Sequence, residues 1–297
     1  VELTSNEFEV FPEVITKLSK LTILLFQQNM ISDVPASVSK LEKLSGLLLS
    51  SNCFKKFPTS VCSIPSLTQL EIDNNGFTEL PTEFSKLVKL KTLVLNKTNV
   101  ENINSIEGLS NLCQIVLNDT KCPRLPSLGQ NNKLTSLSVT HGRLSEINDL
   151  PPNCSYRLSF NEIKSIEFPQ NATAQYLVIA HNKLTKSPNL SQLSKITRLD
   201  LSYNNLKGFS KTSAHPGLQQ LDLSFNPLVE FPLSIAACCN LRTLNMANCH
   251  LFELPEKVFT ALTNLENLLV GFNHLNDVDS LVKLTKLKSL YIQSNNL

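Results

Sequence analysis

An eleven-residue pattern, L-x-x-L-x-L-x-x-N-x-L, recurs along this chain of 297 residues and limits what it can fold into. In one copy, Ile196, Leu199, Leu201 and Leu206 fill the apolar positions, and Asn204 fills the ninth. We count 14 copies, the first and last incomplete, spaced 19 to 24 residues apart. Apolar residues at positions 4 and 6 alternate with polar ones, which is typical of a half-buried strand. One short strand in every copy predicts a stack of coils, each burying its leucines against its neighbours.

The ninth position of the pattern is usually asparagine, although the positions around it are apolar. Its amide can bond backbone groups of the turn and of the adjacent coil, and an unsatisfied buried polar group costs about 1–3 kcal/mol. Thr98, Thr120 and Gly142 offer fewer bonding groups, so the ladder should be weakest from Thr98 to Gly142. We predict a structural ladder formed by Asn29, Asn52, Asn75, Asn161, Asn182, Asn204, Asn226, Cys249, Asn273 and Asn295.

The segments that connect the copies differ in length and composition. Four of them, EVITKLSK, ASVSKLEK, TEFSKLVK and EKVFTALTN, predict short amphipathic turns, each after a proline that ends strand pairing. Residues 147–154 and 166–175 are short and contain proline, which predicts irregular or extended backbone. The curvature of the stack should therefore change around residues 145–180, where a domain boundary is the alternative interpretation.

The 14 copies resemble the leucine-rich repeat family over the whole chain. This resemblance implies an α/β fold: a right-handed leucine-rich-repeat solenoid, or horseshoe, with a parallel β-sheet on its concave face. Short helices, 3-10 or extended turns are implied on the convex face. We expect about 13 strands in a single domain over residues 1–297. Neither end carries a capping element, and exposed terminal repeats are poorly soluble, so we expect a fragment of a longer protein.

Charge and cysteine content limit which cellular compartment and which class of partner the sequence predicts. The net charge is +2, which predicts no strong attraction to nucleic acid or anionic lipid, and no run of about 18 apolar residues predicts a membrane span. The eight cysteines are scattered, without C-x-x-C spacing or disulfide-stapled caps, which favours reduced thiols in a cytoplasmic protein. No signal peptide is visible, and a removed one would instead make the protein extracellular. Five N-x-S/T sequons equal the number that chance predicts.

The sequence predicts no catalytic, cofactor or metal site. Five histidines are spread over the chain, and only Cys249 beside His250 brings a second metal ligand near one of them. No phosphate-binding loop, G-x-G-x-x-G motif or nucleophile elbow occurs, and the chain has only 8 glycines. We therefore predict that this chain is not itself an enzyme.

The solvent-facing side of the predicted sheet carries the candidate partner site. Position 8 is aromatic in the middle coils, and two aspartates at position 5 of adjacent coils lie about 5 Å apart, where like charges repel. This arrangement predicts a basic, partly apolar protein segment across residues 155–230. The candidate residues are Phe160, His181, Arg198, Asp200, Tyr203, Asp222, Phe225 and Phe272. An alternative apolar patch consists of Ile23, Leu25, Leu48, Val94 and Val116. The alternative interpretation is that the acids and rings have no binding role, since L-D-L-S-Y/F-N is a common sequence for this repeat.

The resemblance implies a scaffold or recognition module that binds a protein on the concave face. The N-terminal copies resemble the intracellular Ras-associated class, and residues 102–120 resemble the 22-residue class of type-1 phosphatase regulators, which implies intracellular signalling. The implied partner is a small GTPase, a phosphatase or another signalling protein, without a cofactor, and the oligomeric state stays open. Two alternatives remain: the repeat arm of a larger enzyme, such as a type-2C phosphatase or an adenylyl cyclase, and an extracellular recognition domain.

Overall fold

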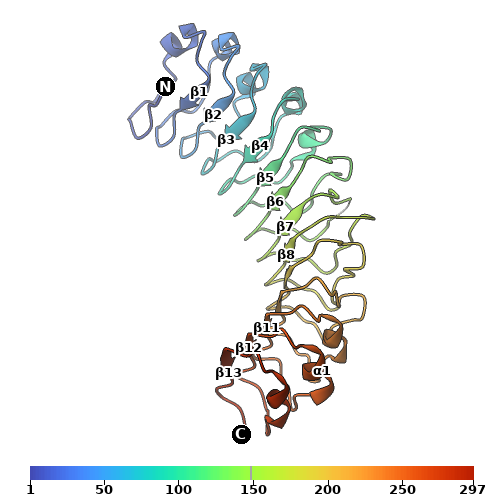
Figure 1. The fold of residues 1–297 in the computed structure, drawn as a ribbon. Helices are drawn as coiled ribbons and strands as arrows, with labels where there is room; N and C mark the ends of the chain where they lie inside the picture. Colours follow the sequence, from blue (N-terminus) through green and yellow to red (C-terminus); the bar gives the residue numbers. More distant parts are fainter. Residues whose placement is uncertain (148) are drawn as a thin grey trace. The chain divides into compact units, whose positions relative to one another are not determined.

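The computed structural model describes residues 1–147 and 149–297. The chain divides into two compact units, residues 1–153 and 154–297, which we refer to as the N-terminal unit and the C-terminal unit. Each unit is a stack of coils in which successive coils contribute one short strand (Figure 1). The expectations of a single domain over residues 1–297 and of changed curvature around residues 145–180 stay predictions.

Thirteen parallel strands of three residues each follow one another in chain order, which confirms the predicted parallel sheet. The N-terminal unit contains β1 (Ile23–Leu25), β2 (Gly46–Leu48), β3 (Gln69–Glu71), β4 (Thr92–Val94), β5 (Gln114–Val116) and β6 (Ser136–Ser138). The C-terminal unit contains β7 (Ser155–Arg157), β8 (Tyr176–Val178), β9 (Arg198–Asp200), β10 (Gln220–Asp222), β11 (Thr243–Asn245), β12 (Asn267–Leu269) and β13 (Ser289–Tyr291). Within each unit, residues at the same pattern position pair from coil to coil, as Leu199 pairs with Leu221. The register of the sheet is therefore the register of the repeat.

Short helices follow several of the strands, as the sequence predicts. The 3-10 helices are η1 (Glu13–Lys17), η2 (Ala36–Lys40), η3 (Thr59–Ser63), η4 (Thr82–Lys86), η5 (Asn104–Ile106), η6 (Leu233–Ala237) and η7 (Asp279–Lys283), and the α-helix is α1 (Glu256–Ala261). Six of these helices begin directly after a proline in extended conformation: Pro12, Pro35, Pro58, Pro81, Pro232 and Pro255. Proline fixes its own φ angle and has no N–H to pair, so it ends the extended segment where the helix begins.

The longest coils all carry a helix. Coils of 23 residues carry a five-residue 3-10 helix, and the 24-residue coil carries the α-helix α1. Of the 22-residue coils, two carry a helix, η5 and η7. Among the described residues between η5 and η6, where the coils have 19 to 22 residues, there is no helix. The predicted irregular segment 166–175 lies in this stretch, as does 147–154, of which Asn148 lies outside the described residues. The helix-free stretch is longer than the two segments that the sequence singled out.

The core lies beneath the sheet inside each stack. The middle residue of every strand from β1 to β12 is buried, while the flanking residues are mostly partly or fully exposed. The largest fully buried side chains include Phe26, Phe54, Phe77, Phe84, Tyr156 and Phe259. Because burying one such side chain stabilises the fold by about 1.5–3 kcal/mol, the stack depends on contacts between neighbouring coils. One face of the sheet is thus committed to the core, and the other is free for recognition.

The ninth-position asparagines connect neighbouring coils through their side chains. The Asn226 amide donates to the carbonyls of Leu223 and Ser224 in its own turn and of Leu201 in the preceding coil, at 2.9, 3.2 and 2.9 Å. Its Oδ1 accepts the backbone N–H of Leu206 at 3.0 Å. Bonds both within the turn and to the preceding coil also occur at Asn29, Asn52, Asn75, Asn182, Asn204, Asn273 and Asn295. Asn161 donates within its own turn to the carbonyls of Leu158 and Ser159.

The substitutes at the ninth position make fewer of these bonds. The hydroxyls of Thr98 and Thr120 donate to carbonyls of their own turns, at Leu95 and Leu117. Within the described part of the chain, neither hydroxyl bonds the preceding coil. The Cys249 thiol does reach back, to the Leu223 carbonyl at 3.2 Å, but a thiol is a weak donor.

A second ladder, at position 7, spans the coils where the asparagine ladder is thin. The side-chain oxygens of Asp73, Asn96 and Asn118 accept the position-7 backbone N–H of the next coil, at 2.7, 2.9 and 3.0 Å. The Asn118 Oδ1 also accepts the hydroxyls of Thr140 and Ser138, each at 2.9 Å. These bonds cross from coil to coil where Thr98 and Thr120 do not, so the sequence-based expectation of a weak stretch overlooked a replacement.

Candidate partner-binding surface

Phe160, His181, Tyr203 and Phe225 form a continuous stack of rings on the C-terminal unit. Successive ring centroids lie 4.1, 3.9 and 4.0 Å apart, and neighbouring ring planes differ by 11°, 12° and 9°. The structure thus brings together four residues that the sequence placed in one row. We refer to these four residues as the ring stack.

The backbone at position 8 explains why the rings align. Every position-8 residue, from Ser5 to Ser294, has a positive φ between 50° and 59°. This left-handed conformation turns the following ninth residue inward and repeats the same side-chain direction in each coil. Asparagine and aspartate adopt it readily, whereas a bulky residue there is unusual. Aromatic residues at this position are therefore not what the backbone alone favours.

The ring stack presents ring edges to solvent, because neighbouring rings cover most of the faces. Phe160, Tyr203 and Phe225 are 42%, 41% and 39% exposed, while His181 is half-buried. The edge of an aromatic ring carries partial positive charge and its face carries partial negative charge. The inner rings of the stack therefore offer apolar, slightly positive edges and no open face for a cation.

Phe272 lies outside the ring stack. The coil between Phe225 and Phe272 carries Asn248 at position 8, which interrupts the row. Phe272 is 54% exposed. Its coil and the preceding one also carry a separate ring cluster. The His274 ring is 6.0 Å from His250 and 5.1 Å from Phe252, centroid to centroid. The sequence showed His250 and His274 at the same position of adjacent coils, but gave no signal for Phe252.

Asp200 and Asp222 face each other across β9 and β10, but both carboxylates have partners in the protein. The Asp222 Oδ1 accepts the N–H and hydroxyl of Ser224, at 2.9 and 2.6 Å, and its Oδ2 accepts the Asn245 amide at 2.8 Å. The Asp200 Oδ1 accepts the N–H and hydroxyl of Ser202. Burial is the main cause that raises the pKa of Asp222, and the charge of Asp200 adds to it. These carboxylates are therefore engaged by their own turns and, at Asp222, by the next coil, so they attract a basic partner less strongly than the sequence suggested.

Arginines line the other end of the same strands. The Arg157 guanidinium lies 4.5 Å from the centroid of the Tyr176 ring and donates to the Tyr176 hydroxyl at 2.5 Å. Arg198, a predicted site residue, is exposed at the start of β9. It borders a hollow of about 260 Å³ whose lining also includes Tyr176 and Gln219. Arg198 thus lies near the start of the strands, away from the ring stack beyond their end.

The alternative patch on the N-terminal unit is interrupted. Leu25, Leu48, Val94 and Val116 occupy position 5, and each is half-buried. Glu71 lies between Leu48 and Val94 in the same row and accepts the Gln69 amide at 2.7 Å. Ile23, at position 3, is 49% exposed. The charged Glu71 divides this apolar row into two smaller parts.

Comparisons with known proteins bear on the repeat itself. A family model described as "Leucine rich repeat" matches residues 239–297, and a second with the same description matches residues 66–87. The chain is a leucine-rich repeat protein. The assignment to the intracellular Ras-associated class remains a prediction. The leucine-rich repeat fold supports a role as a recognition module for protein interactions.

Individual proteins similar to this chain also contain the repeat or share its fold. Chicken (Gallus gallus) lumican is 30% identical over 186 residues, which cover 56% of this chain and 54% of lumican, so the chain spans about half the length of this relative. Two solved structures share the fold. A leucine-rich repeat protein of Leptospira interrogans has a TM-score of 0.82 and 22% identity, covering 99% of this chain and 84% of that one. The ectodomain of an Arabidopsis thaliana membrane receptor kinase, in complex with Casparian strip integrity factor 2, has a TM-score of 0.77 and 22% identity, covering 99% and 38%.

The cysteines of this leucine-rich repeat protein are placed as core and surface thiols. No disulfide joins any of the eight among the described residues. Burial raises the pKa of Cys62 and Cys249 to about 12 and that of Cys238 to about 11, so these thiols stay protonated. Cys53 and Cys239 are exposed.

In residues 1–147 and 149–297, no three His, Cys, Asp or Glu side chains gather as a metal site. In the same residues, no helix has the length and apolarity to cross a membrane.

Proposed function

We propose that this leucine-rich repeat protein is a recognition module that binds a protein partner across the sheet of its C-terminal unit, with the ring stack as the main contact. The observation that carries the proposal is the stack itself: four parallel rings in contact, three of them about two-fifths exposed. Contiguous exposed aromatic surface is unusual unless a partner covers it. Aromatic side chains also concentrate binding energy in interfaces, often about 2 kcal/mol or more for a single residue.

The position of the rings supports binding over a purely structural role. Stacking contributes about 0.5–1.5 kcal/mol for each ring pair, which stabilises the fold without any partner. Yet the N-terminal unit forms the same turns with polar residues at position 8, such as Ser51, Asn74 and Asp119. The fold therefore does not need rings there, and exposing them to water requires another reason.

The proposal places the protein in the cytoplasm as a signalling scaffold, with a small GTPase, a phosphatase or another signalling protein as its partner. Eight cysteines without a disulfide among the described residues, two of them exposed, support a reducing compartment. An extracellular recognition domain is the competing assignment. Counting thiols in protein taken from its native source, denatured without reductant, separates the two: eight free thiols are expected, and four or fewer would place the protein outside the cell.

The binding surface is tested by comparing two double variants of the full chain. Tyr203→Asn/Phe225→Asn removes two rings and introduces the residue that already occupies position 8 at Asn248. Leu25→Ser/Leu48→Ser alters the apolar row of the N-terminal unit. We expect a partner captured by the parent protein, then purified, to lose roughly 30-fold or more in affinity for the first variant, the size of one hot-spot residue.

Because Tyr203→Asn/Phe225→Asn removes two stacked ring pairs, its melting temperature should fall, so affinities are compared at a temperature below the onset of unfolding of both variants. Retained affinity in Tyr203→Asn/Phe225→Asn would remove the ring stack from the interface. Loss confined to Leu25→Ser/Leu48→Ser would move the interface to the N-terminal unit.

A further inference from the structure

A polar, cationic hollow opens where the strands of the C-terminal unit begin. Its volume is about 500 Å³, and its lining includes Lys195, Thr197, Gln219, Asn240, Arg242 and Asn264. The smaller hollow beside Arg198 shares Thr197 and Gln219 with it, so the two are neighbours on one edge. Resting on the proposed function, we propose that this edge binds carboxylates of the same protein partner, which makes the partner acidic where it crosses the strand starts.

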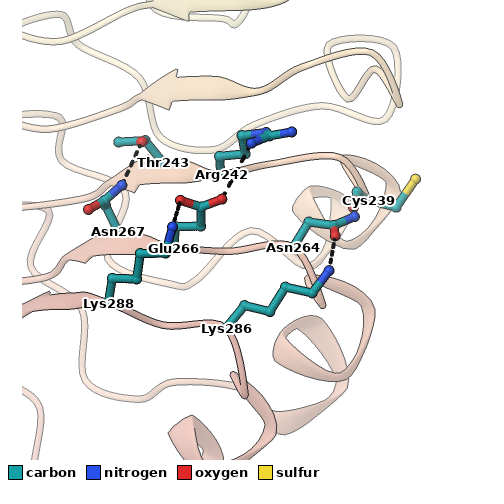
Figure 2. A network of polar contacts seen from close by, with 8 residues as sticks. All are labelled: Cys239, Arg242, Thr243, Asn264, Glu266, Asn267, Lys286 and Lys288. Atoms are coloured by element: carbon teal, nitrogen blue, oxygen red, sulfur yellow. Dashed lines mark hydrogen bonds and ion pairs between the residues drawn. The ribbon is translucent and has the colours of Figure 1, made fainter.

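Basic side chains outnumber acidic ones on this edge. Lys195 and Arg198 are exposed, and within residues 1–147 and 149–297 neither has an ion-pair partner. Glu266 is the acid near the hollow, and Figure 2 shows it between Arg242 and Lys288, with its carboxylate 3.4 and 2.7 Å from their nitrogens. The hydrogen bond from Lys288 is the main cause that lowers the pKa of Glu266, so this acid stays ionised and engaged. Lys195 and Arg198 are therefore open to an acid of a partner.

The polar groups around the hollow are held in place by the coils. The Asn240 amide donates to the Pro216 carbonyl, and the Asn264 amide donates to the Cys239 carbonyl. Lys286 donates to the Asn264 Oδ1 at 2.7 Å, as Figure 2 shows. These bonds fix the walls before a ligand arrives, which lowers the cost of binding.

The rest of the surface argues against a basic partner. Lysine and arginine bind aromatic rings through the ring face, and the inner faces of the ring stack are covered by other rings. The carboxylates of Asp200 and Asp222 are bonded to Ser202, Ser224 and Asn245. Neither feature therefore offers a cation a strong site, whereas the hollow at Lys195 and Arg242, whose described lining contains no acid, offers an anion one.

The same acids set the direction of the partner. Asp200 and Asp222 are at position 5, three residues along the strand from the position-2 side chains that border the hollow of Lys195. Arg198 is nearer to these acids and lines a smaller hollow with both of them, so Lys195 is the main anion contact. Three residues span about 10 Å, close to the distance over which physiological salt screens a charge. An acidic segment is therefore tolerated at the strand starts and repelled further along. The partner should lie with its acidic end over Lys195 and its apolar end over the ring stack.

Two labelled peptides test this assignment on the full chain by fluorescence anisotropy at physiological salt, where the charges of Asp200 and Asp222 are screened. One joins a run of glutamates to a run of leucines and phenylalanines, and the other has lysines in place of the glutamates. We expect the glutamate peptide to bind more tightly. Lys195→Glu should weaken it about fivefold or more, and Lys257→Glu, the same charge change on α1, should leave it unchanged.

Several results would overturn the assignment. The lysine peptide binding more tightly than the glutamate peptide would show a basic partner site. Equal binding to the parent and to Lys195→Glu would remove the hollow from the interface. Displacement of the glutamate peptide by inorganic phosphate at low millimolar concentration would show a site for free anions rather than for a protein segment. Loss of glutamate-peptide binding in Tyr203→Asn/Phe225→Asn alone would uphold the proposed function and contradict only this extension.

Discussion

The two units repeat one backbone but use its exposed positions differently. Position 8 carries Gln28, Ser51 and Asn74 in the N-terminal unit, where the C-terminal unit stacks Tyr203 on Phe225. The N–H groups at position 7 are bonded by side chains of the preceding coil in the first unit and of the same coil in the second. In a repeat protein the turn conformation is set by the core, so surface positions can change without changing the fold. The difference between the units is thus a difference in surface chemistry.

The largest expected effect on stability comes from replacing a ninth-position asparagine, which we compare with replacing a ninth-position threonine. Asn226→Ala removes bonds to its own turn and to the preceding coil, and leaves buried backbone groups unpaired. We expect the free energy of unfolding in urea to fall by about 1–3 kcal/mol. Thr98→Ala removes one bond within its own turn, and should cost about 1 kcal/mol. Asn205→Ala, at an exposed asparagine next to the ladder, is the control.

Equal losses for Asn226→Ala and Thr98→Ala would contradict the difference drawn between asparagine and threonine at the ninth position. An Asn226→Ala variant as stable as the parent would show that water replaces the amide at this position.

The second prediction concerns the position-7 ladder of the N-terminal unit. Asn118→Ala removes an acceptor that serves the Thr140 N–H and the hydroxyls of Thr140 and Ser138. We expect a loss of about 1–2 kcal/mol in the free energy of unfolding. Ser224→Ala, the same position in the C-terminal unit, should cost less than 1 kcal/mol, since its N–H keeps the bond to Asp222 and alanine already occupies this position at Ala247. A larger loss for Ser224→Ala would reverse the assignment of this ladder to the N-terminal unit.

The core of the fold can be predicted from the sequence because the same apolar positions recur in every copy of the repeat. The apolar spacing predicts the strands, the prolines mark the helix starts, and the number of strands follows from the number of copies. Coil length explains the helix-free stretch only in part, because 22-residue coils occur both with a helix, as at η7, and without one. These features depend on residues close together in the chain, which is why a single sequence reveals them.

The candidate site is less readable because it depends on how side chains of different coils meet. The sequence placed Asp200 and Asp222 side by side, but their bonds to Ser202, Ser224 and Asn245 depend on rotamers. The hollow at Lys195 joins residues of four coils, mainly at position 2 and just before position 1, where the repeat pattern prescribes no residue type. One feature of the backbone was equally hidden in the sequence. Val229 adopts a φ of 64°, which is unusual for a β-branched residue, and the Val229 N–H donates to the Cys249 carbonyl in the next coil.

The smallest expected effect is the contribution of Asp222 to the pH dependence of stability. Burial raises the pKa of this carboxyl above its ordinary value of 3.8, so the folded state holds the proton more tightly than the unfolded state does. As the pH rises through 3.8, the unfolded state ionises first, and the contribution of Asp222 to stability falls until the folded carboxyl ionises too. Asp222→Asn does not titrate. The free energy of unfolding of the parent, relative to this variant, should therefore decrease as the pH rises through this window. Asp119→Asn, at an exposed aspartate of the N-terminal unit, is the control. If the parent instead gained stability relative to Asp222→Asn with rising pH, the bonds from Ser224 and Asn245 would outweigh burial, and Asp222 would be a carboxylate that the fold stabilises in its charged form.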